Sequence, residues 1–132
     1  MFVPRMKLRI RGNSLRLRVS RTELLQIAEQ GLAEDSIRFA PGMEWRYGIE
    51  VKPSGDVAAR FAVNSLRVVL PKARVDQWLD DREVAIEGHQ AIGNGETLRI
   101  LVEKDYTCLA PRTGEDDADL FVNPQQPNGA TC

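Results

Sequence analysis

Basic and apolar side chains alternate on both sides of a Gly12-Asn13-Ser14 turn near the start of the chain. Successive side chains of a strand point to opposite faces, so a hairpin over residues 6–19 presents one apolar face and one basic face. Guanidinium groups bind phosphates, and a two-stranded ribbon fits the major groove of a DNA duplex, where an asparagine can contact adenine. The candidate nucleic-acid-binding residues are Lys7, Arg9, Arg11, Asn13, Arg16, Arg18 and Arg21.

The basic face of this hairpin requires negative charge beside it. Like charges directly opposite one another on paired strands destabilise the pairing, and Arg9, Arg11, Arg16 and Arg18 would lie side by side. Three sources of negative charge are open: the phosphates of DNA, an acidic protein partner, and the chain's own carboxylates. The face could also simply be solvated. The chain's own carboxylates could come from neighbouring strands or from the acidic residues near its other end.

A second group of reactive side chains lies near the end of the chain. Cysteine thiolates, carboxylates and an imidazole together can bind a transition metal, and two cysteines can also form a disulfide or remain free thiols. The cysteines do not form a Cys-x-x-Cys motif, so their spacing excludes a zinc knuckle or a thioredoxin-like site. The candidate metal-binding residues are Cys108, Asp116, Asp117, Asp119 and Cys132, with His89 as an optional further ligand.

His89 is the single histidine of the chain and lies in a glycine-rich stretch, residues 88–95, that predicts a flexible hairpin connection. The glycines lack the strand-to-helix context that a phosphate-binding loop needs. The sequence places no second histidine, serine or cysteine beside His89, so no acid–base or nucleophilic site can be assembled. We therefore expect a non-enzymatic protein that needs no cofactor.

Length and composition indicate one soluble domain. The 132 residues are 42% hydrophobic and 28% charged, and no apolar run approaches the roughly 20 residues that a membrane helix requires. No secretory signal is visible, so we expect a cytoplasmic protein with no membrane partner. The net charge of −1 excludes binding of polyanions through total charge, but the charge is polarised from a basic start to an acidic cluster at 115–119.

Caps and periodicity predict the elements that follow the hairpin. Ser20 and Glu23 match a capping box, and Gly31 sits where a left-handed residue ends a helix, so we expect a helix over about 21–30. Two strands should follow, over 36–40 and 44–51. The buried stripe of the helix would consist of Leu24, Ile27 and Ala28.

The pattern starts again after a turn at residues 53–56. Asn64-Ser65-Leu66-Arg67 repeats the sequence of residues 13–16 after 51 residues, and the apolar positions beyond it match those of the first copy. Pro71 fits the start of a second helix, where its missing N–H does no harm. The buried stripe of that helix would consist of Val75, Trp78 and Leu79. Further strands are expected over 57–63, 83–87 and 97–103.

Each half therefore consists of strand, strand, helix, strand and strand. Two such halves would bury their sheet faces against one another as a closed or nearly closed β-barrel with two short helices. The sequence predicts a mainly β domain over residues 1–104, with repeats at about 6–52 and 57–103. An irregular, acidic tail rich in proline and glycine should occupy residues 105–132.

The motifs of the first half resemble a known family. The run Arg11-Gly12-Asn13-Ser14-Leu15-Arg16-Leu17-Arg18-Val19, followed by Glu23-Leu24-Leu25 and Gly31-Leu32-Ala33-Glu34-Asp35, is similar to the swapped-hairpin domains of AbrB regulators and MazE antitoxins. In that family two chains each supply a strand-strand-helix-strand-strand unit to one barrel. The resemblance implies a single-chain pseudo-dimer of this kind, monomeric or homodimeric, that acts as a DNA-binding regulator or antitoxin-like protein.

Overall fold

The first hairpin forms as its alternation predicts. The computed structural model describes residues 6–80, 82–105 and 121. Strands β1 (Lys7–Arg11) and β2 (Ser14–Val19) pair antiparallel, and Gly12 turns the chain with a φ of 55°. The register places Arg9 opposite Arg16 and Leu8 opposite Leu17, which confirms one basic and one apolar face.

Helix α1 (Arg21–Gln30) begins with the predicted capping box. The N–H of Glu23 donates to Ser20 Oγ at 3.3 Å, and the N–H of Ser20 donates to Glu23 Oε1 at 2.9 Å. The helix ends at Gly31, in the left-handed region at a φ of 74°. Leu24 and Ile27 are buried, but the expectation for Ala28 was wrong because that side of the helix faces solvent.

Helix α2 (Lys72–Trp78) follows Pro71, which makes no side-chain cap. Val75 and Trp78 are buried as expected, whereas Leu79 is exposed because the helix ends before it. Neither helix of the described part of the chain is long and apolar enough to span a membrane.

Two strands depart most from the sequence prediction. The expected strand over 36–40 starts four residues too late, because β3 (Leu32–Ala40) begins directly after the helix and pairs Leu32 with Glu50. The stretch expected as a loop over 88–95 is mostly strand, and the turn is confined to the residues after Gly93. The remaining strands are β3 (Leu32–Ala40), β4 (Met43–Lys52), β5 (Ala58–Ala62), β6 (Ser65–Pro71), β7 (Ala85–Gly93) and β8 (Glu96–Lys104).

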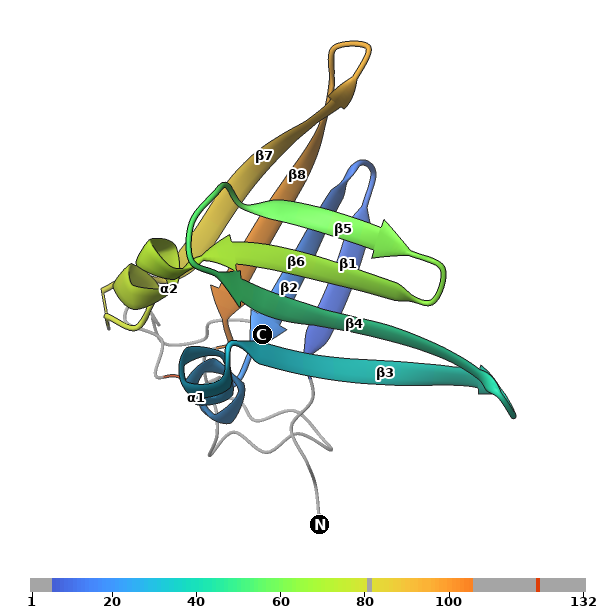
Figure 1. The fold of residues 1–132 in the computed structure, drawn as a ribbon, viewed down its shortest axis with the longest axis horizontal. Helices are drawn as coiled ribbons and strands as arrows, with labels where there is room; N and C mark the ends of the chain where they lie inside the picture. The colour runs from blue at the N-terminus through green and yellow to red at the C-terminus, as the bar shows by residue number, and fades with distance from the viewer. Residues whose placement is uncertain (1–5, 81, 106–120, 122–132) are drawn as a thin grey trace, which may run out of the picture.

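The eight strands form two four-stranded sheets, with the orders β1-β2-β8-β7 and β3-β4-β6-β5. Parallel pairing of β2 with β8, and of β4 with β6, joins the hairpins within each sheet. Each sheet therefore contains one hairpin from each half of the chain. The strands of one sheet cross those of the other at a steep angle, with both helices at one end (Figure 1).

The expectation of a closed barrel was wrong: among the described residues no strand ladder joins one sheet to the other. Where β5 and β7 approach, the side chain of Gln90 takes the place of a ladder. The N–H of Ala59 donates to Gln90 Oε1 at 2.7 Å, and Gln90 Nε2 donates to the carbonyl of Ala59 at 3.3 Å. Gly88 permits the approach, because a Cβ there would lie 2.6 Å from Val57 Cγ1.

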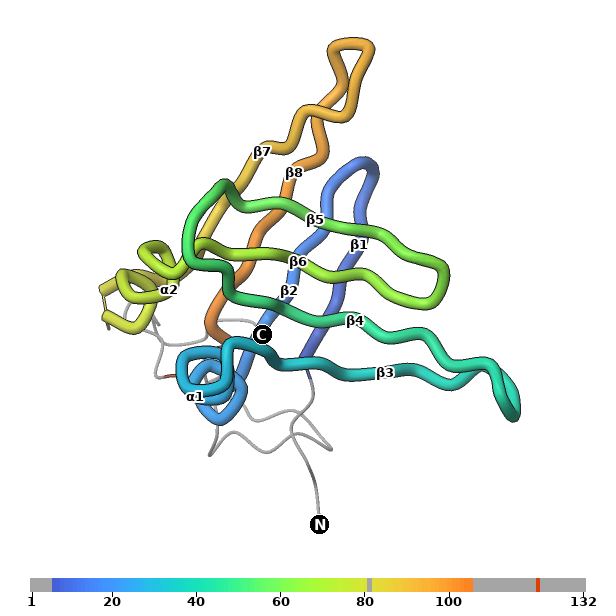
Figure 2. The backbone as a smooth tube through the Cα atoms, in the orientation of Figure 1, coloured from blue at the N-terminus to red at the C-terminus, as the bar shows by residue number. Residues whose placement is uncertain are grey.

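The core lies between the two sheets and is closed at one end by the helices (Figure 2). Trp78 from α2 and Ile27 from α1 are fully buried against it. The fully buried side chains of the strands are Leu17, Val19, Ile49, Val68, Leu70, Ile86, Ile100 and Val102. Phe121 packs on the same core, and its N–H donates to the carbonyl of Asp105 at 2.8 Å.

Candidate nucleic-acid interface

The basic face of the β1–β2 hairpin points away from the core. Lys7 lies opposite Arg18, and Arg9 lies opposite Arg16, so like charges face one another at two successive positions. Parallel pairing with β8 extends this outer face, placing Glu103 beside Arg18 and Leu101 beside Arg16.

Carboxylates of the chain itself neutralise part of this face. Glu103 Oε1 lies 3.0 Å from Arg16 Nε and 3.2 Å from Arg18 Nε, so one carboxylate serves two guanidinium groups. Lys7 Nζ lies 2.8 Å from the largely buried carboxylate of Asp105. Of the three sources of negative charge considered above, neighbouring residues of the fold thus supply a share.

Arg9 and Arg11 complete the face and remain exposed. Neither side chain has an ion-pair or hydrogen-bond partner among the residues that the structure describes. The hairpin therefore presents an excess of positive charge that the described fold does not balance.

Asn13 and Arg21 lie outside the row of arginines on the two strands of the hairpin. Asn13 Nδ2 donates to the carbonyl of Thr97 at 2.8 Å, and the carbonyl of Asn13 accepts the N–H of Arg99 at 3.1 Å, so the turn is fastened to β8. Arg21 is the exposed first residue of α1, beyond the far end of β2.

Arg99 belongs to this face although it was not among the predicted site residues. It lies beside Ser14 in the β2–β8 register, and its Nε donates to Glu87 Oε1 at 3.2 Å. His89 Nε2 lies 3.0 Å from the same oxygen. The alternation of β8 predicts that Arg99 and Glu103 share a face, but it carries no signal that β8 pairs with β2.

The matched hairpin β5–β6 carries the same central pair on the outer face of the other sheet. Arg60 lies opposite Arg67, as Arg9 lies opposite Arg16. Glu50 Oε1 lies 3.2 Å from Arg60 Nη2 and 3.1 Å from Arg67 Nη1, and Arg67 Nη2 also bonds Glu34. Each guanidinium group of this pair therefore has a carboxylate partner.

The pKa values of this second face follow from these contacts. Hydrogen bonds from Lys52 and Arg67 lower the pKa of Glu50 below its ordinary value. Hydrogen bonds to Glu34 and Glu50 raise the pKa of Arg67. Both shifts stabilise the charged forms, so this face is a network of ion pairs.

A single position explains why the first face lacks such a network. In the second sheet Gly48 lies between Arg67 and Glu34 in register, and the arginine side chain passes over it. In the first sheet Leu101 occupies the matched position between Arg16 and Glu87. Arg16 bonds Glu103, and no contact between Arg16 and Glu87 is present.

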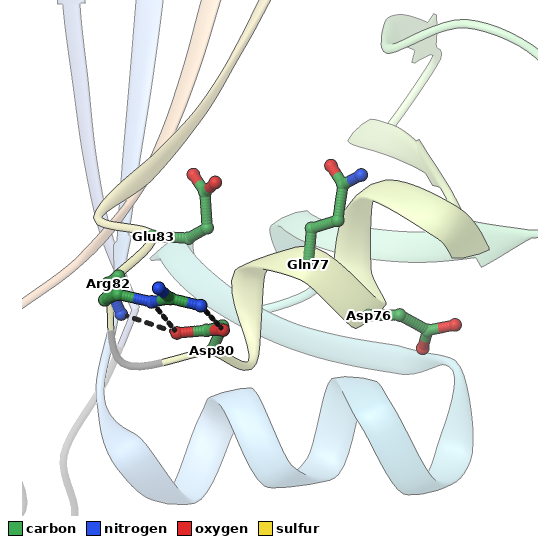
Figure 3. A pocket seen from close by; sticks show the side chains of 5 residues that line it. All are labelled: Asp76, Gln77, Asp80, Arg82 and Glu83. Carbon is green, nitrogen blue, oxygen red and sulfur yellow. Dashed lines mark hydrogen bonds and ion pairs between the residues drawn. The ribbon is translucent and has the colours of Figure 1, made fainter.

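A hollow beside helix α2 is lined mostly by charged side chains. It measures about 620 Å³ and is lined by Asp76, Gln77, Asp80, Arg82 and Glu83 (Figure 3). Arg82 Nη2 lies 3.1 Å from Asp80 Oδ2, and side-chain and backbone hydrogen bonds from Arg82 lower the pKa of Asp80 to about 2. Asp80 and Arg82, two of the charged groups of this hollow, are thus already paired with one another.

The candidate metal-binding residues of the tail, Cys108, Asp116, Asp117, Asp119 and Cys132, lie outside the described residues. Within the described ranges, no group of three or more histidine, cysteine or acidic side chains is arranged to hold a metal ion. His89 belongs to β7, where it contacts Glu87.

Comparison with known proteins gives a family for the chain. No curated protein and no solved structure matches it. One family model matches residues 6–125, a span that includes both sheets and both helices. The chain therefore belongs to that family, described as a family of unknown function (DUF7009).

Proposed function

We propose that this chain is a non-enzymatic DNA-binding protein, a regulator or antitoxin-like protein, that contacts the duplex with the basic face of the β1–β2 hairpin. The observation that carries the proposal is the unbalanced charge of Arg9 and Arg11, whose guanidinium groups have no partner among the described residues. Exposed guanidinium groups on a ribbon bind phosphates, and phosphate contacts supply most of the non-specific affinity for DNA.

The matched hairpin argues against a purely structural role for this charge. Where arginine pairs stabilise the fold, as at Arg60 and Arg67, each guanidinium group has a carboxylate partner. Arg11 is matched by Ala62 and Lys7 by Ala58 in the second hairpin, so the fold forms a corresponding ribbon without those charges.

The strand order supports the resemblance to swapped-hairpin regulators. Each sheet combines one hairpin of residues 7–52 with one of residues 58–104. This is the exchange that the resemblance implies for a dimer fused into one chain. In this proposal Asn13 fixes the turn against β8 rather than contacting a base, because its amide already donates to Thr97.

The proposal is tested by fluorescence anisotropy with mixed-sequence duplex DNA at low salt. We expect binding that weakens as salt is added, with a log–log slope of about 0.9 per phosphate contacted. Arg9→Ala with Arg11→Ala should lower the slope by about two and weaken binding at every sequence tested. Arg16→Ala with Arg18→Ala should weaken binding less, because Glu103 already neutralises part of their charge.

The matched control is Arg60→Ala, which removes the equivalent charge from the second sheet. It should leave the affinity for DNA unchanged. No binding by the wild-type protein at low salt overturns the proposal, and so does an equal loss from Arg60→Ala and from the Arg9 and Arg11 substitutions. An acidic protein partner in place of DNA would give the first of these results.

A further inference from the structure

Strand β3 forms an edge of the second sheet and presents backbone polar groups to its open side. Ser36 lies opposite Arg46 in the register with β4, and the N–H of Arg46 donates to Asn64 of β6 at 2.9 Å. The pair Ser36–Arg46 is therefore a non-hydrogen-bonded pair, in which the N–H and C=O of Ser36 face away from β4. In agreement, the N–H of Ser36 donates to its neighbour's carboxylate, Asp35 Oδ1, at 2.9 Å.

The β3–β4 hairpin also carries exposed apolar side chains. It extends past the edge strand β1 of the other sheet (Figure 1). Ile37, Phe39 and Met43 of this hairpin are 47% to 69% exposed.

We propose that β3 pairs antiparallel with β3 of a second copy about a two-fold axis at Ser36. Glu34 and Arg38 have the same backbone orientation as Ser36, two residues away on either side, so all three can join such a ladder. An axis at Ser36 places Glu34 opposite the partner's Arg38, and the reverse. Opposite charges directly across a strand pair stabilise it, whereas an axis at Arg38 would set like charges face to face.

Arg38 is available for this contact. Its side chain is 72% exposed and lies at 3.9 Å from Glu44, the longest of the ion-pair distances on this sheet. A β-bulge between Arg38 and Ala40 ends the regular part of β3. The ladder is therefore confined to residues 34–38, and Phe39 of each copy lies at opposite ends of it, facing the partner's Ala33.

The matched edge strand β7 lacks these features, which selects β3. His89 occupies the position of Ser36, since it lies opposite Arg99, whose N–H donates to Asn13. The positions of Ile37 and Arg38 are taken by Gln90 and Ala91. The amide of Gln90 is bonded to Ala59, and pairing of two β7 strands would bring no opposite charges together.

The dimer does not rest on the proposed DNA binding, because β3 and the basic face belong to different sheets. Sedimentation equilibrium over a range of protein concentrations tests it. We expect the wild-type protein to reach twice the mass of one chain. Ser36→Pro should remain monomeric, because proline removes the outward N–H at the axis while leaving the ladder to β4 intact.

His89→Pro is the matched control and should dimerise like the wild-type protein. Arg38→Glu sets Glu34 against a carboxylate at two places, and we expect the dissociation constant to rise at least tenfold. Adding Glu34→Arg to it restores opposite charges and should recover part of that loss. A monomeric wild-type protein at all concentrations, or equal dissociation by His89→Pro and Arg38→Glu, overturns the proposal.

Discussion

The hairpins β1–β2 and β5–β6 are two versions of one ribbon with opposite treatment of charge. Arg9 and Arg16 correspond to Arg60 and Arg67, and each pair lies directly opposite across two antiparallel strands. In the second ribbon the carboxylates of Glu34 and Glu50 bind the pair. In the first, one carboxylate, Glu103, is shared by Arg16 and Arg18.

The difference shows that the size of the side chain between an arginine and a carboxylate decides whether the two can form an ion pair across the sheet. Gly48 leaves a path over the sheet from Arg67 to Glu34, whereas Leu101 stands at the same place between Arg16 and Glu87. A half-buried leucine thus keeps an arginine from a carboxylate on the next strand. The first ribbon carries more positive charge because it has Lys7, Arg11 and Arg18 where the second has Ala58, Ala62 and Val69.

Gly48→Ala should give the largest loss of stability among the substitutions that test this comparison. A Cβ at this position would lie 2.5 Å from the carbonyl oxygen of Ala33, which is backbone and cannot move aside cheaply. We expect a loss of about 1–3 kcal/mol in the free energy of unfolding, measured by urea denaturation. Leu101→Ala, at the matched half-buried position, should lose less. Equal stability of Gly48→Ala and the wild-type protein would contradict this account of the second ribbon.

The helices that follow the two ribbons differ in their caps. Ser20→Ala removes the capping box of α1 and should lower the free energy of unfolding by about 1 kcal/mol. Arg21→Ala, in the same turn and without an ion pair in the described part of the chain, should change it little. Helix α2, which Pro71 leaves without a side-chain cap, should exchange its amide hydrogens faster than α1. Slower exchange in α2 would show that packing of Trp78 outweighs the cap.

Removal of Arg67 and removal of the matched Arg16 should change the stability of the protein differently. Arg67→Ala leaves Glu34 and Glu50 with fewer partners, and we expect a loss of about 0.5–1 kcal/mol at low salt. Arg16→Ala loses the ion pair with Glu103 but also removes a like charge opposite Arg9, so the protein should be as stable as the wild type or slightly more stable. Chemical denaturation at low and high salt distinguishes them, because salt should shrink both differences. Equal losses from both substitutions would mean that Leu101 does not separate the two surfaces.

The smallest effect on stability should come from the ion pair between Asp80 and Arg82 in the segment that follows α2. Arg82 lowers the pKa of Asp80 from its ordinary value of 3.8 to about 2. A depressed carboxyl pKa stabilises the folded state above the unfolded value, so this contribution should be present above about pH 4 and lost as the pH falls towards 2. Asp80→Asn should remove that part of the acid dependence in thermal melts. The connection after α1, a single Gly31, has no such pair. An unchanged acid profile in Asp80→Asn would count against the Asp80–Arg82 pair.

Local patterns in the sequence predicted the elements whose signals are local. Alternation found β1, β2 and β4, and Ser20 with Glu23 found the start of α1. The sequence Leu-Ala-Glu-Asp at the start of β3 has no alternation, because that edge strand is held by pairing with β4. Gly88 indicated a loop, but it lies within strand β7. Its lack of a side chain makes room for Val57, which packs closely against it.

The counter-charges of the candidate site could not be predicted in the same way. The basic residues of the first hairpin are visible as a spacing, but Glu103 and Arg99 join them through a parallel pairing with a strand at the far end of the sequence. Which strands pair in this way depends on the packing of the whole sheet and not on the local sequence of either strand. The missing barrel closure has a similar origin, since the amide of Gln90 satisfies Ala59 where a ladder was expected.

The exchange of hairpins between the halves has a consequence for how the chain can be divided. A cut within the exposed turn at residues 53–56 would leave two fragments, each holding two hairpins that belong to different sheets. Neither fragment could complete a four-stranded sheet alone, so each should be poorly folded by itself. Mixed together, the fragments should reassemble with a rate and a yield that depend on their concentrations, which makes the protein a natural candidate for a split reporter.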